Sequence, residues 1–388
     1  MAIPFKVNLR GLFVRKISTI TTVACLGLVV CVFSALMALA SGIHHTFDTS
    51  GDPLNVMVMR DGSTSETNSL VTLEQFQTLR TLPGVAKRAD GTAIAVGEAV
   101  IIVNKDKRGT KDGANIILRG VSPEGFAVHP EVKIVEGRPF QPGKSELIVS
   151  RPIAKKFESC GLGETLNLEK RNFQVVGLFE AGGSAHESEI WGDVTEVRET
   201  FTRTVYSTVL LRAEDASAVP SIVTAVKEDR RLKLKAMSES LYFADQTKSA
   251  LPIEAAAFFI APFLAIGAGF GAANTMYAAV AARSKEIGTL RALGFSRFAI
   301  LVAYLTEALV LGLVGGIVGT GLTYLVLNGV QTGTINWTTF SEVSFPFRVS
   351  PVVISVAIAI ASAIGALGGL LPASLAARAR ITQSIRQI

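Results

Sequence analysis

Residues 283–294 read RSKEIGTLRALG, a short charged run between two long apolar segments, 255–282 and 298–327. Each apolar segment is long enough to cross the hydrocarbon core of a bilayer, which is about 30 Å thick. So short a connection leaves no room for a folded domain, but it can form one helix at the membrane surface. We therefore expect two membrane spans joined by a small surface helix.

The pattern within this run predicts an amphipathic helix. Ile287, Leu290 and Leu293 recur every three residues and share one side of such a helix. The polar residues lie mostly elsewhere on it: Lys285, Glu286, Thr289 and Arg291. Gly294 is a candidate C-terminal cap. A small helix of this kind between two spans is a shape that another protein can bind.

The same stretch resembles the coupling segment of MacB/FtsX-type ABC transporter permeases, with the approximate pattern N-x-M-x-x-x-V-x-E-R-x-x-E-I-G-x-x-R-A-L-G. The matching residues are Asn274, Met276, Val280, Arg283, Glu286, Ile287, Gly288, Arg291, Ala292, Leu293 and Gly294. The usual Glu before the Arg is Ala282 here. In this family the segment is a cytoplasmic helix on which an ATPase docks. The resemblance implies the following docking residues: Glu286, Ile287, Gly288, Leu290, Arg291 and Leu293.

The composition agrees with a membrane protein that carries a substantial soluble part. The chain has 388 residues, of which 49% are hydrophobic and 18% charged. Its mean hydropathy is +0.41. The charged share lies below the typical quarter for soluble proteins, and the length allows two domains.

The net charge of +6 is concentrated beside the spans. Residues 1–18, 282–297 and 372–388 carry eleven Lys and Arg and one Glu, so the remainder of the chain is acidic. Basic residues that flank membrane spans usually remain on the cytoplasmic side. Because the positive charge lies beside the spans, it does not indicate a nucleic-acid partner. The three cysteines support no disulfide framework and no cysteine metal site: Cys25, Cys31 and Cys160.

The first span is predicted at 19–42, after a basic N-terminal cytoplasmic segment, 1–18. A cleaved signal peptide is the competing interpretation, because residues 38–40 read ALA. We favour an uncleaved anchor because the apolar run exceeds the usual length of a signal peptide's core.

Residues 43–250 are soluble in character and are predicted to form an α+β domain outside the membrane. Strands are expected at 55–59, 93–103, 116–121, 146–149, 165–168, 173–178, 205–211 and 232–236. Helices are expected at 73–79, 153–157 and 218–227. The order of elements, with VEGRPF at 135–140 and FQVVG at 173–177, resembles the extracytoplasmic core domain of the same permeases.

The rest of the chain is predicted to add three spans, which makes four in all. They lie at 251–282, 298–327 and 351–371, separated by the coupling segment 283–297 and an outer loop, 328–350. A cytoplasmic tail, 372–388, follows, and its PASLAAR opening resembles the family ending. Both termini are then cytoplasmic in an inner-membrane, multi-pass protein.

Glycines four residues apart occur in the apolar spans: Gly267 and Gly271, Gly312 and Gly316, Gly315 and Gly319. Such pairs let helix backbones approach closely. They pack either within one chain or between two permease copies, and the sequence does not separate these alternatives. Glu307, inside the third span, is either a structural carboxylate near the interface or a functional group.

Three strings that suggest catalysis fail on inspection. Residues 137–145 end in GKS, but the glycine spacing is one too long for a phosphate-binding loop and two prolines remove amides. Residues 186–190 read HESEI, where isoleucine replaces the second histidine of a zinc-protease helix. Residues 182–186 lack the last glycine of a hydrolase nucleophile elbow. We therefore predict no catalytic residue, cofactor or metal ion in this chain.

The resemblance implies a permease subunit that couples ATP hydrolysis by a separate ATPase dimer, which binds ATP and magnesium, to export or extraction of a substrate outside the inner membrane. Other implied partners are a second permease copy, membrane lipids, a periplasmic adaptor and an outer-membrane channel. One alternative is an FtsX-like signal transducer that activates an outer enzyme. Another is a membrane-anchored sensor or enzyme without an ATPase.

Overall fold

The computed structural model describes residues 16–336 and 338–378, which form two compact units. The helical unit contains the described residues of 1–41, 251–330 and 347–388, and the α+β unit contains 42–250 and 331–346. Most of the predicted N-terminal segment, 1–18, and of the tail, 372–388, lies outside the described residues.

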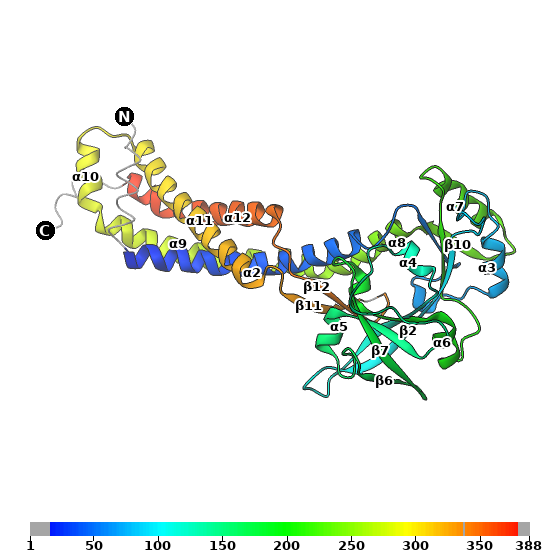
Figure 1. Cartoon of the computed structure of the whole chain (residues 1–388). Coiled ribbons are helices and arrows are strands. Elements are labelled where there is room, and N and C mark those ends of the chain that lie inside the picture. Colours follow the sequence, from blue (N-terminus) through cyan, green and yellow to red (C-terminus); the bar gives the residue numbers. More distant parts are fainter. Residues whose placement is uncertain (1–15, 337, 379–388) are drawn as a thin grey trace. The chain divides into compact units, whose positions relative to one another are not determined.

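Four helices of the described chain are long and apolar enough to cross a membrane. They are α2 (Lys16–Asp48), α9 (Leu251–Ala282), α11 (Arg297–Leu327) and α12 (Pro351–Arg378). The predicted architecture of four apolar helices, with a large α+β domain between the first and the second, is confirmed. A short helix, α10 (Ser284–Ala292), lies across one end of the long helices (Figure 1).

Two of these helices exceed the predicted spans. Helix α2 continues from the predicted end at Gly42 to Asp48, because no helix-breaking residue occurs before Gly51 and Pro53. Helix α12 continues through Pro372 to Arg378. An internal proline removes one backbone hydrogen bond, but the alanine-rich sequence after it still favours the helix.

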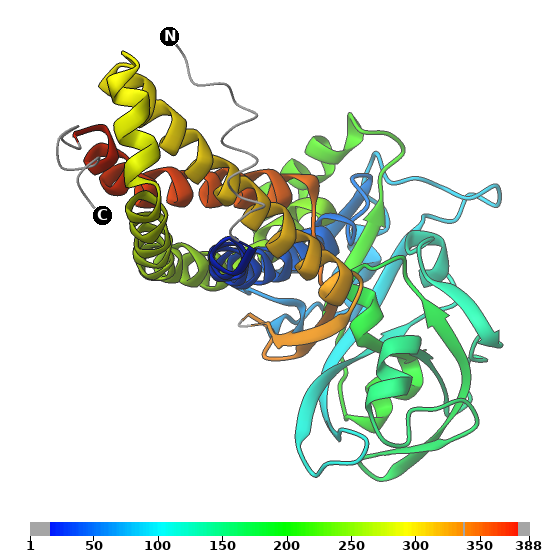
Figure 2. The ribbon, with the colours of Figure 1, turned by 90° about the vertical axis from the view of Figure 1, so that its left-hand side faces the viewer.

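The α+β unit is built on one ten-stranded sheet, whose strands run from blue (β1) through cyan to green in Figure 2. Its strands are β1 (Asn55–Arg60), β2 (Ala95–Asp106), β3 (Gly113–Val121), β4 (Lys133–Gly137), β5 (Glu146–Ser150), β6 (Thr165–Leu168), β7 (Arg171–Glu180), β8 (Glu189–Asp193), β9 (Thr208–Arg212) and β10 (Leu234–Ser238). The order is β10-β1-β9-β2-β3-β8-β5-β7-β4, with β6 paired to β7. The pairs β3–β8 and β5–β7 are parallel, and the other pairs are antiparallel.

Short helices flank the sheet: α3 (Leu73–Leu79), α4 (Gly125–Val128), α5 (Arg151–Lys156), α6 (Val194–Thr200), α7 (Ala218–Glu228) and α8 (Glu239–Gln246). Single 3₁₀ turns occur at η1 (Glu66–Asn68), η2 (Ala185–Ser188) and η3 (Thr247–Ala250). Several helix starts follow from local sequence. The Asp193 carboxylate accepts from the amides of Thr195 and Glu196 at the start of α6, and the Ser238 hydroxyl accepts from the Leu241 amide at the start of α8.

The predicted outer loop, 328–350, is not a simple loop. It contains the hairpin β11 (Gln331–Ile335) and β12 (Glu342–Pro346), and this hairpin belongs to the α+β unit. The Ser344 amide donates to the Ser188 hydroxyl over 2.7 Å. Phe345 and Val343 are buried on β12, so the hairpin is part of the core of that unit.

Candidate functional site

Helix α10 is fixed at its C-terminal end by the predicted glycine cap. Gly294 has a φ of +92°, a conformation that favours glycine. Its amide donates to the Arg291 carbonyl over 3.2 Å, and the Phe295 amide donates to the Leu290 carbonyl over 3.1 Å. These two bonds form a Schellman motif. Ser296 then caps α11, because its hydroxyl accepts from the Ala299 amide, so a very short connection joins the two helices.

The six predicted docking residues do not share one environment. Ile287 and Gly288 are buried, and Ile287 is only 2% exposed. Leu293 is 69% exposed, and the Glu286 side chain is 72% exposed. Leu290 and Arg291 are half-buried. Ile287, Leu290 and Leu293, which the period of three places on one side of the helix, therefore differ in burial: Ile287 is buried, Leu290 is half-buried and Leu293 is exposed.

Ile287 is buried because residues from three other helices surround it. It belongs to a cluster of buried residues from α9, α11 and α12: Met276, Ile300, Tyr304, Ala308, Leu311, Ala373, Ala376 and Ala377. This contact attaches α10 to the helical unit. The residues of α10 that remain exposed are Lys285, Glu286, Thr289, Ala292 and Leu293. The outward face is polar, with one large apolar side chain at its C-terminal end.

An ion pair joins the start of α10 to the interior of α11. Arg283 Nη1 lies 3.5 Å from Glu307 Oε2, and Arg283 Nε lies 3.6 Å from Glu286 Oε2. The Glu307 side chain is only 5% exposed. Glu307 is thus a partner of the coupling segment, a role that the sequence analysis missed. The signal available in the sequence was a carboxylate inside an apolar span, about three helical turns after the basic residue Arg297.

Most of the predicted packing glycines pack within the chain. A Cβ on Gly312 would lie 2.6 Å from the Ala361 carbonyl oxygen, and one on Gly316 would lie 3.1 Å from the Ile358 Cα, both on α12. Gly319 packs in the same way against the Gly27 backbone of α2. These glycines permit close approach of α11 to both neighbours.

The remaining pair of predicted packing glycines lies on α9. A Cβ on Gly271 would be 3.3 Å from the Cys25 sulfur, whereas one on Gly267 would have no described atom within 4 Å. An apolar groove of about 310 Å³ runs between α9 and α12 beside this surface, lined in part by Phe270 and Leu367. Only 17% of the most apolar stretch of this helix is buried in the chain, against 39–44% for the other three.

The α+β unit contains a buried ionic network around Arg119 on β3. Its guanidinium contacts Glu66 at 2.8 Å, Glu98 at 2.5 Å and Glu189 at 2.8 Å. Burial alone would raise the pKa of Glu189, but the Arg119 charge outweighs it and holds this pKa well below its usual range. Burial would likewise raise the pKa of Glu98, but His129 and Arg119 lower it to about 2. The carboxyl groups of Glu98 and Glu189 are therefore ionised at neutral pH.

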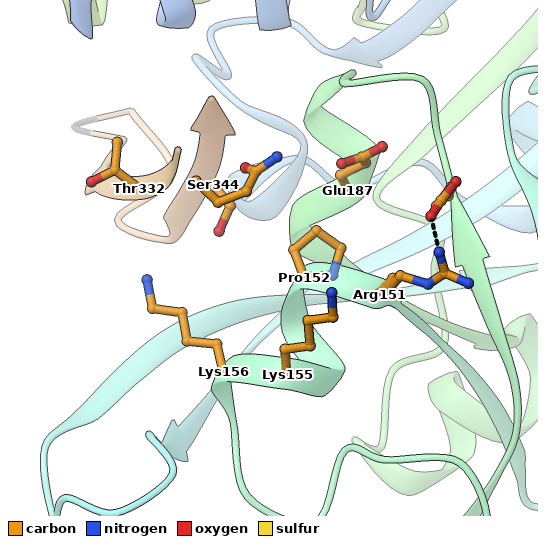
Figure 3. Close-up of a pocket in the computed structure, with 9 residues that line it drawn as sticks. Arg151, Pro152, Lys155, Lys156, Glu187, Thr332 and Ser344 are labelled. Atoms are coloured by element: carbon orange, nitrogen blue, oxygen red, sulfur yellow. Dashed lines mark hydrogen bonds and ion pairs between the residues drawn. The ribbon is translucent and has the colours of Figure 1, made fainter. Parts of the chain in front are cut away.

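A polar pocket of about 560 Å³ lies between α5 and the β11–β12 hairpin. Lys155 and Lys156 extend from α5 in this pocket, and Thr332 and Ser344 come from the hairpin (Figure 3). Arg151 pairs with Glu180 over 2.6 Å, and Lys156 pairs with Glu342. Two of the three basic side chains that line the pocket are therefore already paired with carboxylates.

The sequence matches two family models. It matches the MacB-like periplasmic core domain over residues 17–229 and the FtsX-like permease C-terminal domain over residues 258–381. The first match alone covers more than half of the chain. The two matches correspond to the α+β unit with its preceding helix and to the last three long helices.

Similar curated proteins are permeases. The macrolide export ATP-binding/permease protein MacB of Bdellovibrio bacteriovorus is 23% identical over 325 residues, which cover 74% of this chain and 48% of that protein. MacB of Neisseria gonorrhoeae is 25% identical over 292 residues, covering 70% and 43%. The uncharacterized ABC transporter permease YknZ of Bacillus subtilis is 26% identical over 282 residues, 68% of each protein. The chain spans about half the length of the MacB relatives it matches.

Two solved structures are also similar to parts of the chain. The periplasmic region of MacB from Actinobacillus actinomycetemcomitans is 14% identical with a TM-score of 0.37, covering 54% of this chain and 97% of that one. The extracellular domain of YknZ from Gram-positive bacteria is 18% identical with a TM-score of 0.36, covering 47% and 100%.

Proposed function

Because the chain belongs to the MacB/FtsX-type family of ABC transporter permeases, we propose that it is the membrane subunit that couples a separate ATPase to work on the far side of the membrane. The observation that carries the proposal is α10, a short helix fixed to its own unit on one face and exposed on the other. The basic residues beside the spans favour a cytoplasmic position for α10 and an outer position for the α+β unit.

In this proposal the ATPase contacts the exposed residues of α10, and the buried residues transmit its motion. Leu293 and Glu286 are the contact residues, with Leu290 and Arg291 at the edge. Ile287 holds α10 against the neighbouring helices. A push on the exposed face would then move α9 and α11 together, because α10 is joined to both by short connections.

The partners follow from the same family membership. YknZ is named as a permease alone, whereas the MacB relatives are named as ATP-binding/permease proteins. This difference supports a partner ATPase that binds ATP and Mg²⁺, with the present chain acting as a non-catalytic subunit. The poorly buried α9 surface around Gly267 supports contact with a second permease copy or with lipid. The substrate is extracted or exported at the outer side of an inner membrane.

The test compares alanine substitutions of two leucines at α10 with the same substitution of a leucine on α11. The ATPase that co-purifies with the tagged wild-type chain is identified by mass spectrometry, and both proteins are reconstituted in nanodiscs. We expect the Leu290→Ala/Leu293→Ala variant to express normally but to lose ATPase binding and permease-stimulated hydrolysis. Leu322→Ala, an equally apolar change at an exposed position of α11, should leave both unchanged.

Two results would contradict the proposal. One is that the wild-type chain repeatedly co-purifies with no nucleotide-hydrolysing protein. The other is that the double variant on α10 binds and stimulates the ATPase as well as the wild type does. Cysteine-accessibility mapping of residues 284–294 tests the orientation separately, because labelling from the outer side would rule out the docking role.

A further inference from the structure

Three buried side chains in the α+β unit meet at one point although they come from separate segments. His129 follows α4, His186 lies in η2, and Glu239 is the first residue of α8. Each of the three is 1% exposed. Neither the Arg119 network nor the coupling segment requires this convergence, and the sequence analysis predicts no metal site here.

The atoms that face one another have no hydrogen-bond partner among the described residues. They are His129 Nδ1, His186 Nε2 and Glu239 Oε1. One ligand atom from each residue lies within 4.8 Å of those of the other two. Buried polar atoms in folded proteins are nearly always satisfied, and a group left unsatisfied costs free energy. Two imidazole nitrogens and one carboxylate oxygen, buried within 4.8 Å of one another, form a donor set that a metal ion can use.

The opposite side of each residue is held by a second polar group. His129 Nε2 lies 2.9 Å from Glu98 Oε1, and His186 Nδ1 lies 3.2 Å from Glu189 Oε2. When a carboxylate accepts a hydrogen bond from the far ring N–H of a neutral imidazole, the near ring nitrogen keeps its lone pair. Histidines that bind metals usually carry such a carboxylate or carbonyl partner.

Glu239 is oriented in the same way. Its Oε2 accepts from the Asn55 side-chain amide over 2.8 Å and from the Asp52 backbone amide over 3.1 Å. These bonds leave Oε1 directed at the histidines. The carboxylate is thus positioned by two donors from one loop and strand, independently of the imidazoles.

A fourth oxygen donor, from Glu131, lies beside the two imidazoles. Glu131 Oε1 lies 3.5 Å from His129 Nδ1 and 3.5 Å from His186 Nε2. Hydrogen bonds between nitrogen and oxygen are shorter, typically 2.7–3.2 Å. Zinc binds imidazole nitrogen and carboxylate oxygen at about 2.0–2.2 Å, so ligand atoms at the corners of its tetrahedron are about 3.3–3.6 Å apart. The distance from His129 Nδ1 to Glu239 Oε1, 4.0 Å, is slightly longer than the edge of such a tetrahedron.

The charge of the surroundings also favours a cation. Within residues 16–336 and 338–378, Arg119 is the only arginine paired with the carboxylates of the cluster and its supporting network. These five carboxylates are Glu66, Glu98, Glu131, Glu189 and Glu239. Buried carboxylates require compensation by opposite charge. A divalent ion at the place where the three unpaired atoms meet would supply it.

We propose that His129, Glu131, His186 and Glu239 bind one divalent cation of the zinc class in a closed, four-coordinate structural site. Two imidazoles and two carboxylates suit zinc, and four protein ligands leave no open position for catalysis. The ion links the segment after α4, the η2 turn and the start of α8. The inference does not depend on the proposed transport function.

The experiment measures metal binding by the full-length chain in detergent. After chelator treatment and dialysis, the chain is titrated with Zn²⁺ and, separately, with Co²⁺, and the bound metal is counted by mass spectrometry. We expect one equivalent per chain and the intense visible bands of tetrahedral Co²⁺. The His129→Asn/His186→Asn variant should lose at least 100-fold in affinity and the Co²⁺ bands. His45→Asn, a histidine outside the cluster, should keep both.

A further measurement needs no variant, in case the double variant does not fold. X-ray absorption at the zinc edge of the wild-type chain should show four nitrogen or oxygen ligands, including two imidazoles. The proposal is overturned if the wild type binds no stoichiometric metal, if binding persists unchanged in a folded double variant, or if the bound ion is six-coordinate.

Discussion

Replacing Gly312 by alanine should destabilise the helical unit, whereas the same change at Gly267 should not. The added Cβ at Gly312 would lie 2.6 Å from the Ala361 carbonyl oxygen and 2.9 Å from the Ser362 Cα. Both contacts are with backbone, which cannot rotate away, so α11 and α12 must separate. At Gly267 the new methyl group would meet no described atom within 4 Å.

The two substitutions form a matched pair. Both replace a glycine in a helix interior, so each gains about the same helix propensity, ~1 kcal/mol. That gain cancels in the comparison. Overpacking of a tight contact costs about 1–3 kcal/mol. We therefore expect Gly312→Ala to be less stable than Gly267→Ala by about 1–3 kcal/mol.

The assay is denaturant unfolding of the purified chain in mixed micelles, followed by the helical signal in circular dichroism. Cross-linking in nanodiscs provides a second measurement, because a second copy seated against α9 would make Gly267→Ala alter dimer formation without altering folding. If the two variants unfold within about 0.5 kcal/mol of each other, the close packing of α11 against α12 is not what holds this unit together.

Three further predictions follow from buried side chains. Arg119→Met should cost about 3–5 kcal/mol in unfolding free energy, because three buried carboxylates lose their counter-charge, whereas Arg231→Met, at a mostly exposed side chain, should change it by less than about 0.5 kcal/mol. Burial raises the pKa of Cys160 to about 11, so its thiol should react slowly with maleimide at pH 8 until the chain unfolds. A Cys25→Ser/Cys31→Ser background isolates this thiol, and fast labelling of the folded chain would contradict the prediction. Ile287→Ala should destabilise the helical unit by about 2–5 kcal/mol in the same unfolding assay, whereas Leu293→Ala should not, and equal effects would contradict the two-faced arrangement of α10.

The parts of the fold that depend on local composition could be predicted. Long apolar runs are sufficient to identify four membrane helices. Gly294 as a cap was also predictable, because a positive φ is a local requirement that glycine meets without strain. In both cases the energy that decides the structure arises within a few residues, or from the surrounding bilayer.

Strand β8 shows why other elements could not be predicted. Its sequence, EIWGD, has two acidic residues and a glycine, which are uncommon in strands. It is nevertheless fully buried, because β3 and β5 pair with its two edges. Glu189 is tolerated there because Arg119 on the neighbouring strand neutralises it. A composition rule applied to β8 alone cannot include a partner that lies far away in the chain.

Contacts between distant segments also determine α10 and the proposed metal site, so local sequence patterns could not predict either fully. The period of three placed Ile287 and Leu293 on one side of α10, but residues from α9, α11 and α12 decide which of them is buried. The string HESEI lacks the second ligand of a zinc-protease helix, and this absence led to a prediction of no metal site. The histidine that lies near His186 is His129, from a segment with no spacing relation to it.

The proposed metal site lies at an informative position along the chain. Glu239 begins α8, and α8, η3 and α9 follow one another without an intervening non-helical residue, ending at Ala282 just before α10. In the proposed mechanism, displacement of α10 enters α9 and reaches α8 along this path. A metal ion bound by Glu239 would attach the start of α8 to the sheet. The link runs through His129, which lies beside Glu239 and beside Glu98 on β2. Loss of the ion should therefore weaken coupling while ATPase docking on α10 persists, which distinguishes a transmission role from a docking role.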